Sequence, residues 1–187
     1  PQPYESIIAA GPDGSGELFE QAGQAGIRCI RLKHLKRAIS LQSERQAFKE
    51  LKAVVQCESP DIVHLNSTKA GVIGTLAVGS MAKLIYTVHG WVFLERLPAW
   101  RKAMYRIAEK VSTRSIDRII VLSEHDRQEG IKLGVKLSKL KIVRNGISAQ
   151  EFLPAKDAVS KLEQLCSASF ENNHIVLCIA NFYSTKG

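Results

Sequence analysis

Short apolar runs rich in β-branched residues recur along the chain, and stretches of helical length separate them. Runs of this length that lie between turn-forming residues are typical of buried strands, whereas the intervening segments follow the helical period. The pattern predicts strands at residues 6–10, 27–32, 62–65, 84–88, 118–122, 141–143 and 175–180.

The helical pattern is clearest in the segment SERQAFKELKAVVQ, residues 43–56. Phe48, Leu51, Val54 and Val55 fall on one face, and basic residues lie largely on the other. A second segment, STKAGVIGTLAVGSMA, is rich in small residues that permit close packing. Because continuous apolar strands alternate with helices, we expect an α/β fold: a doubly wound, Rossmann-like parallel sheet covered on both faces.

Composition and charge narrow the class of protein. The chain has 187 residues, 45% of them hydrophobic and 24% charged, which suits one domain or one and a fraction. No apolar run approaches the roughly 18 residues of a membrane span, and no signal peptide is visible, so we expect a soluble cytoplasmic protein. The four cysteines form no C-x-x-C pair and are read as small hydrophobic residues. A net charge of +8 favours anionic partners: phosphates, nucleic acid or an anionic membrane leaflet.

Parallel sheets bind ligands beyond the carboxyl ends of their strands, so the strand-to-helix junctions are the places to search. The first junction, GPDGSG, has its glycines in the order G-x-x-G-x-G, which is not the dinucleotide pattern. Basic residues, Arg28, Arg31 and Lys33, stand in and beside the second strand, where a dinucleotide site carries an acid. An ordinary turn is favoured, and a loop that binds phosphate is the alternative.

Two further junctions begin with helix-capping residues. In NSTKAG, Ser67 and Thr68 can cap the following helix and Lys69 adds a cation, which suits a phosphate or carboxylate. The alternative is a plain cap with a solvated lysine. In LSEHD, Ser123 and Asp126 have the spacing of a capping box, so His125 is expected on the helix surface.

The fourth junction, TVHGWVF, ends an apolar strand on a histidine and a glycine. An imidazole at this position points toward a cleft, and Gly90 permits a sharp turn or leaves room for a ligand. His89 is therefore the main candidate functional residue, with a structural histidine bonded to nearby backbone as the alternative. His64, one strand earlier, could be a second cleft residue or a buried one.

Five segments together resemble glycosyltransferase family 4 in order and spacing: PDIVHLNSTKAGVIGTLA, IYTVHGWVF, YRIAEKVSTRSIDRIIVLSEHD, LGVKLSKLKIVRNGISAQEF and IANFYSTKG. The resemblance implies a GT-B enzyme with two Rossmann-like domains, a retaining mechanism and no metal or other cofactor. It places an acceptor domain at residues 1–147, lacking the family's first strand, and the linker and start of the donor domain at 148–187. No D-x-D pair that would hold a metal ion occurs in the chain.

The resemblance also implies roles for particular residues. His89 is expected to position the transferred sugar by hydrogen bonding. Lys186 and Gly187 match the end of the loop that binds the donor diphosphate, although Asn181 stands where arginine is common. The remaining expected substrate-binding residues are Gly90, Ser67, Thr68, Lys69, Ser123, Asn145 and Gly146.

The segment LPAWRKAMYRIAEKVSTRS places apolar residues on one helical face and cations elsewhere. This face could pack on the sheet, or it could lie on an anionic membrane at the inner leaflet, with Trp100, Arg101, Lys102 and Arg106 facing the lipid. The resemblance favours a nucleotide-sugar donor of the UDP type as a partner, together with a polyprenyl-linked or saccharide acceptor, and no nucleic acid. An NADP-dependent oxidoreductase and a non-catalytic anion-binding domain remain alternatives.

Overall fold

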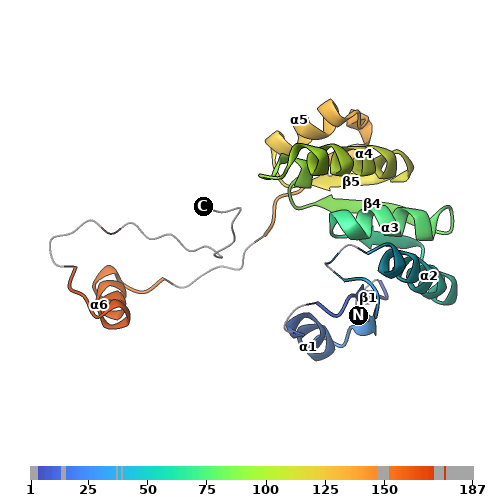
Figure 1. Cartoon of the computed structure of the whole chain (residues 1–187). Helices are drawn as coiled ribbons and strands as arrows, with labels where there is room; N and C mark the ends of the chain where they lie inside the picture. The colour runs from blue at the N-terminus through green and yellow to red at the C-terminus, as the bar shows by residue number, and fades with distance from the viewer. Residues whose placement is uncertain are drawn as a thin grey trace. The chain divides into compact units, whose positions relative to one another are not determined.

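The computed structural model describes residues 4–13, 16–36, 38, 40–146, 152–170 and 175. The chain divides into two compact units, Pro1–Arg144 and Asn145–Gly187. Within the described part of the first unit, parallel strands alternate with helices (Figure 1). The elements are β1 (Ile7–Ala10), α1 (Glu17–Gln24), β2 (Arg28–Arg31), α2 (Leu41–Glu58), β3 (Ile62–Leu65), α3 (Thr68–Val78), β4 (Lys83–Val88), the 3₁₀ helix η1 (Val92–Leu94), α4 (Ala99–Ser115), β5 (Arg118–Val121), α5 (Glu124–Leu133), the 3₁₀ helix η2 (Leu137–Lys139) and β6 (Leu140–Ile142).

The second unit contains α6 (Ala155–Cys166) among its described residues. The strand predicted at 175–180 lies outside the described residues apart from Ile175. The six earlier strands are confirmed to within about two residues at each end, the usual uncertainty of strand and helix limits. The domain boundary at residue 147 stays a prediction.

Every strand pair in the described residues is parallel, which confirms the α/β class. The strands form two ladders and not one continuous sheet: β1 pairs with β2, and a second sheet has the order β3-β4-β5-β6. No ladder joins β1 to β3 in the part of the chain described. Helices α2 and α3 hold the two sheets together, because each packs apolar side chains both against the second sheet and against Leu32, which follows β2.

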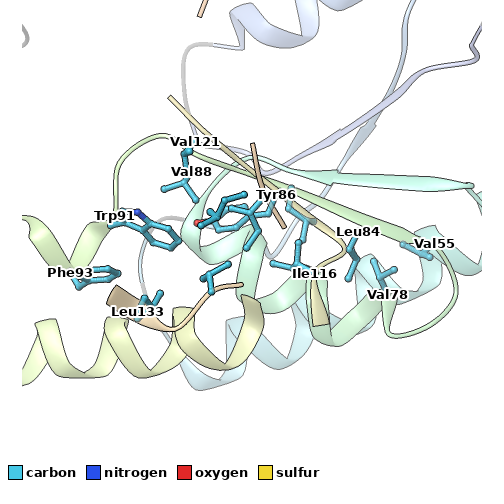
Figure 2. Close-up of a cluster of buried hydrophobic side chains, with 14 residues drawn as sticks. Val55, Val78, Leu84, Tyr86, Val88, Trp91, Phe93, Ile116, Val121 and Leu133 are labelled. Atoms are coloured by element: carbon cyan, nitrogen blue, oxygen red, sulfur yellow. The ribbon is translucent and has the colours of Figure 1, made fainter. Parts of the chain in front are cut away.

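Apolar side chains from alternate positions of the central strands build the larger core. Leu84, Tyr86 and Val88 of β4 lie in the same buried cluster as Val121 of β5 (Figure 2). The register pairs Tyr86 with Ile119 and Val88 with Val121, so both β5 residues share that face, and all five are nearly inaccessible to solvent. Helices α2, α3 and α5 contribute apolar side chains to the same cluster. In a pleated strand, residues two apart point to the same side of the sheet. The alternate apolar positions of β4 and β5 therefore form one buried face against these helices.

A smaller core ties β2 to the helices. Leu32, just after β2, packs with Leu51 of α2 and Ala77 of α3, as the amphipathic pattern of residues 43–56 predicts. The small residues of α3 allow close approach to β3: a Cβ atom at Gly74 would lie 2.4 Å from the Leu65 Cδ2 atom. Close packing by this helix is thus confirmed.

The cysteines differ from expectation. Cys29 is half-buried, as a small hydrophobic residue can be, whereas Cys57 and Cys166 are exposed near the ends of α2 and α6 and pack in no core among the described residues. Helical periodicity alone does not mark the end of a helix, where even its apolar face can reach solvent. No helix in the described ranges has both the length and the hydropathy to span a bilayer.

Candidate functional site

The candidate residues of three junctions gather at one edge of the second sheet. Ser67 and Lys69 follow β3, His89 follows β4 and Ser123 follows β5, and these three strands are parallel neighbours. Their carboxyl ends therefore meet at the same edge, which is where open α/β sheets bind ligands. His89 follows the middle strand of the three, so it lies between the two capped helix starts.

The backbone after β4 explains why His89 stays at the surface. Gly90 has φ of 109°, a conformation that side chains rarely adopt, so the chain turns sharply at this residue. Trp91 then enters the core, only 1% exposed, and its indole Nε1 donates a hydrogen bond to the Asp126 carbonyl oxygen at 2.8 Å. The Trp91 and Phe93 rings pack with centroids 5.5 Å apart. His89 is left exposed at the end of the strand.

His64 lies on the same face of the sheet as His89. Its register partner on β4 is Ile85, and residues 85, 87 and 89 alternate onto that face. The His64 Nε2 atom lies 2.7 Å from the Thr87 Oγ1 atom, although the side chain remains exposed. Partial burial, and then the charge of His89, lower the pKa of His64, which favours a neutral imidazole. His64 is thus hydrogen-bonded but exposed, so the reading of a buried histidine is wrong, and a role in a cleft stays a prediction.

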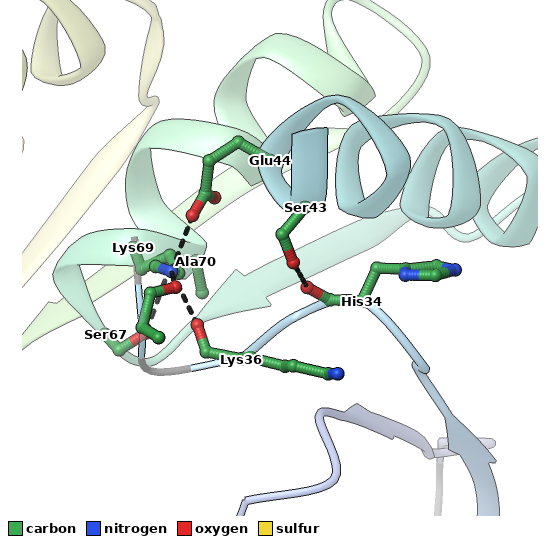
Figure 3. Close-up of polar contacts among 8 residues, drawn as sticks. His34, Lys36, Ser43, Glu44, Ser67, Lys69 and Ala70 are labelled. Carbon is green, nitrogen blue, oxygen red and sulfur yellow. Dashed lines mark hydrogen bonds and ion pairs between the residues drawn. The ribbon is translucent and has the colours of Figure 1, made fainter. Parts of the chain in front are cut away.

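The junction after β3 is tied to the segment that follows β2. The Ser67 Oγ atom accepts a hydrogen bond from the Ala70 amide at 3.1 Å, which confirms the cap. Lys69 Nζ donates to the carbonyl oxygens of Lys36 at 2.5 Å and Ala38 at 2.7 Å, and pairs with Glu44 at 2.7 Å (Figure 3). Its ammonium therefore holds Lys36 and Ala38 against the start of α3. Binding of a substrate anion by Lys69 stays a prediction, and it would require exchange of these contacts.

The same connecting segment is held by a second set of contacts. The backbone amides of Lys33 and His34 donate to the Glu50 carboxylate at 2.7 and 3.1 Å. The Ser43 hydroxyl donates to the His34 carbonyl oxygen at 3.0 Å (Figure 3). Helix α2 thus fixes a basic loop beside the candidate site, a link that the sequence pattern did not indicate.

Sequence reasoning also missed a buried acid behind the site. Glu109 of α4 has no exposed surface, and its Oε1 atom accepts a hydrogen bond from the Tyr86 hydroxyl at 3.0 Å. The Tyr86 oxygen lies 3.5 Å from the Thr68 hydroxyl at the start of α3. Among the described residues, Glu109 Oε2 has no partner. Burial raises the pKa of Glu109, so the neutral acid is favoured.

We expect the Glu109→Gln variant to gain stability over the natural chain as pH rises. The folded pKa of Glu109 is raised, so the unfolded chain loses this proton above about pH 4.5 while the folded chain keeps it. The natural chain therefore loses stability across that window, whereas glutamine can keep the bond from Tyr86 without titrating. Urea unfolding at pH 4, 6 and 8 measures the difference, with exposed Glu95→Gln as control. A constant difference between variants at all three pH values would contradict a raised pKa.

The remaining predicted residues are placed as follows. The Ser123 Oγ atom accepts from the Asp126 amide at 3.1 Å, which confirms Ser123 as the cap of α5. The Asp126 carboxylate accepts from the Ser123 hydroxyl at 2.6 Å, whereas in a capping box it would accept from the Ser123 backbone amide. His125 is exposed. Asn145 and Gly146 are exposed in the second unit. Lys186 and Gly187 lie outside the described residues. Substrate contacts by all of these residues, and by Gly90 and Thr68, stay predictions.

The glycine-bearing junction after β1 is shaped by close backbone packing. A Cβ atom at Gly11 would lie 1.8 Å from the Leu35 carbonyl oxygen, so only glycine fits there. The Arg31 guanidinium lies 4.1 Å from the centre of the Phe19 ring and is engaged with α1. Both contacts favour the structural turn over a phosphate-binding loop.

Helix α4 presents its apolar stripe to solvent. Trp100 and Ile107 are each 64% exposed, and Met104 and Val111 are also exposed, whereas the opposite side buries Glu109, Ser112 and Thr113. The sequence left open whether this stripe packs on the sheet; in the described residues it does not. Arg101 and Arg106 are exposed beside it, and Lys102 is half-buried.

These features define an α/β domain with parallel strands and a candidate site at their carboxyl edge. Residues 3–151 match the family described as Glycosyltransferase Family 4, and the chain belongs to this family. It is 30% identical over 144 residues to the UDP-Gal:alpha-D-GlcNAc-diphosphoundecaprenol alpha-1,3-galactosyltransferase of Escherichia coli, covering 75% of this chain and 37% of that protein. It is 29% identical over 124 residues to the putative glycosyltransferase EpsD of Bacillus subtilis (strain 168), covering 63% and 31%. The chain thus spans about a third of the length of these relatives.

Solved structures agree on the fold. Anabaena Alr3699/HepE, in complex with UDP and glucose, superposes with a TM-score of 0.64 at 20% identity, covering 88% of this chain and 44% of that one. Sucrose-phosphate synthase from Thermosynechococcus elongatus gives 0.59 at 16% identity, covering 84% and 52%. The Rossmann-like fold expected for the first domain of a GT-B enzyme is confirmed.

Proposed function

We propose that this chain forms the acceptor-binding part of a glycosyltransferase that moves a sugar from a UDP-sugar to an acceptor in polysaccharide or glycan synthesis. The observation that carries the proposal is the exposed His89, held at the carboxyl edge of the central strand by the Gly90 turn and the buried Trp91. An imidazole there can hydrogen-bond a sugar hydroxyl or stabilise charge that develops as the glycosidic bond breaks. Membership of the family supports transfer chemistry.

The finer assignments rest on the relatives and on the family resemblance. The Escherichia coli relative is named for a UDP-Gal donor and a GlcNAc-diphosphoundecaprenol acceptor, which favours a polyprenyl-linked acceptor here. A retaining and metal-independent mechanism is proposed from the resemblance. Without a metal, amides, helix starts and cations such as Lys186 would neutralise the leaving diphosphate.

A donor and acceptor screen of the full-length gene product tests this function. UDP-galactose, UDP-glucose and UDP-N-acetylglucosamine would each be offered with GlcNAc-diphosphoundecaprenol, with and without EDTA. We expect transfer from one donor, unaffected by EDTA, with the anomeric configuration of the donor kept in the product as read by NMR. Transfer abolished by EDTA, or an inverted product, would refute the proposed mechanism, and no transfer from any UDP-sugar would refute the proposed function.

We further propose that α4 places the enzyme on an anionic membrane that carries the acceptor. The exposed stripe of Trp100, Met104, Ile107 and Val111 has the geometry of an interfacial helix, because it faces away from the buried side of α4. Cations of the helix, Arg101, Lys102, Arg106, Lys110 and Arg114, can contact anionic headgroups. Their aliphatic stems permit such contacts even from the sides of the helix.

An exposed apolar stripe flanked by cations should bind anionic membranes more tightly than neutral ones. We expect the protein to sediment with vesicles of phosphatidylcholine and phosphatidylglycerol, and much less with phosphatidylcholine alone. Ile107→Glu should weaken binding to the mixed vesicles about tenfold or more, since burial of one such side chain contributes about 1.5–3 kcal/mol and each surface charge about 1 kcal/mol.

The matched control is Leu137→Glu, a change of the same kind at an exposed position of η2. It should leave vesicle binding close to that of the natural protein. Equal losses from both substitutions would point to a general charge effect, and equal binding to both kinds of vesicle would remove the membrane proposal.

A further inference from the structure

Three side chains connect the interior of the first unit with the carboxyl edge of the second sheet. Glu109 of α4 is fully buried and accepts a hydrogen bond from the Tyr86 hydroxyl at 3.0 Å. The Tyr86 hydroxyl lies 3.5 Å from the Oγ1 atom of Thr68, the first residue of α3. Thr68 is half-buried and lines a groove at this edge, whereas Tyr86 and Glu109 are buried. A buried pair therefore stands directly behind a residue of the candidate site.

The first turn of α3 packs directly on the Tyr86 ring. A Cβ atom at Gly71 would lie 3.2 Å from the Tyr86 Cε2 atom and 3.3 Å from its Cζ atom, so a larger residue would crowd the ring. The ring itself is 1% exposed and belongs to the larger core. The core thus fixes the place of the Tyr86 hydroxyl, and the close contact at Gly71 fixes the start of α3 beside it.

The hydrogen-bond pattern gives the Thr68 hydroxyl a defined direction. Because Tyr86 donates its one hydroxyl proton to Glu109, its oxygen is left to accept from Thr68. Burial raises the pKa of Glu109, and the nearby Thr68 and Tyr86 hydroxyls oppose that rise, as hydroxyls do when their protons point toward a carboxyl group. With its only side-chain proton directed inward, the Thr68 oxygen faces the groove with lone pairs alone.

The contact between Thr68 and Tyr86 is the weakest of the chain. Its 3.5 Å separation is long for two hydroxyl oxygens, which usually lie within about 3.0 Å of each other when bonded. A ligand hydroxyl that donates to Thr68 would polarise the chain and strengthen this contact, because consecutive hydrogen bonds reinforce one another in a low-dielectric interior. Binding at Thr68 and the buried pair are coupled in this way.

We propose that Tyr86 and Glu109 are positioning residues, which hold Thr68 as a hydrogen-bond acceptor for one hydroxyl group of the sugar that receives the transfer. The assignment rests on the proposed function, in which this unit binds the acceptor substrate. Sugar hydroxyls carry protons that the Thr68 oxygen can accept, whereas the oxygens of an ionised diphosphate carry none. Thr68 therefore selects the saccharide part of the acceptor substrate and not its diphosphate.

Titration of the full-length gene product with GlcNAc-diphosphoundecaprenol in detergent tests the proposal, with binding followed by tryptophan fluorescence. Thr68→Val removes the hydroxyl at nearly constant volume and should raise Kd about tenfold, within the range for one lost hydrogen bond. Thr68→Ser keeps the hydroxyl and should recover most of the affinity. Tyr86→Phe keeps the ring but frees the Thr68 proton, so it should raise Kd about fivefold. Glu109→Leu, which takes away the group that holds the Tyr86 proton, should do the same and serves if Tyr86→Phe fails to fold.

Combining Thr68→Val with Tyr86→Phe separates positioning from a structural effect. If Tyr86 acts only through Thr68, the double variant should bind about as weakly as Thr68→Val alone, whereas independent effects would multiply to about 50-fold. Thr75→Val is the matched control, because it removes a hydroxyl of the same helix that donates to the Gly71 carbonyl oxygen at 2.6 Å. It should change Kd by less than about twofold. Thermal unfolding checks that each variant is folded at the titration temperature.

Multiplied losses in the double variant, or an unchanged Kd for Thr68→Val, would overturn the positioning role, and so would an equal loss for Thr75→Val. Sugar transfer to the same substrate is measured alongside, to keep this result apart from the proposed function. Binding without transfer, with the expected order of Kd values, would refute the transfer function and leave the hydrogen-bond assignment standing. A natural protein that neither binds the substrate nor transfers sugar to it would refute both.

Discussion

Replacing His89 with alanine in the full-length gene product is expected to lower kcat/KM for sugar transfer about 30-fold to 1000-fold. A loss of this size corresponds to about 2–4 kcal/mol of transition-state stabilisation, the range for removing one well-placed hydrogen-bond group from an active site. Because His89 is exposed, the thermal unfolding of the variant should match that of the natural protein. Steady-state kinetics with the UDP-sugar identified in the donor screen provides the measurement.

The matched control is His125→Ala, which removes an exposed histidine of α5 at the neighbouring junction. Its kcat/KM should stay within about twofold of the natural value, since small surface effects of up to about 0.5 kcal/mol are common. If His89→Ala turns over at the natural rate, His89 has no part in the chemistry. If both variants lose activity equally, the effect is a general change of charge at the site.

Replacing Trp91 with alanine should destabilise the fold by about 3–5 kcal/mol, the usual result of truncating a large buried aromatic residue. The indole fills space between the sheet and α5, where its ring approaches within 3.2 Å of the position a Cβ atom would take at Gly130. Its loss also removes the donor to the Asp126 carbonyl oxygen. Urea unfolding followed by circular dichroism measures the change.

Trp100→Ala removes a tryptophan that is exposed, whereas Trp91 is buried. This tryptophan is exposed on α4, so its replacement should change the free energy of unfolding by no more than about 0.5 kcal/mol while weakening binding to anionic vesicles. A loss of stability at Trp100 as large as that at Trp91 would mean that the α4 stripe is covered in solution. A stable Trp91→Ala variant would mean that the turn after His89 is not anchored by the indole.

Much of the fold follows from local patterns. The apolar runs located the described strands, and the face of α2 that carries Leu51 and Val55 is the face that is buried. The caps at Ser67 and Ser123 were also readable, because a hydroxyl three residues before a free amide is a short-range arrangement. The turn at Gly90 is a property of one residue and its neighbours.

The partners of long-range contacts were not readable. Lys69 looked like a free cation, but its ammonium donates to the carbonyl oxygens of Lys36 and Ala38, which lie more than 30 positions earlier in the chain. Nothing in the local pattern singled out Glu109, which accepts a hydrogen bond from Tyr86 inside the domain. Each contact depends on which strands are neighbours, and strand order is not encoded in the period of a single segment.

The amino-acid sequence by itself determined the alternation of strands and helices, the caps and the position of His89 at a strand end, because all of these depend on residues close together in the chain. Only the tertiary structure decided that α4 turns Trp100 and Ile107 outward, that Lys69 secures a loop, and that β1 and β3 are not joined by a ladder. Those outcomes depend on which apolar surfaces find partners and which backbone edges are paired. Packing of distant segments sets both, so no local pattern reports them.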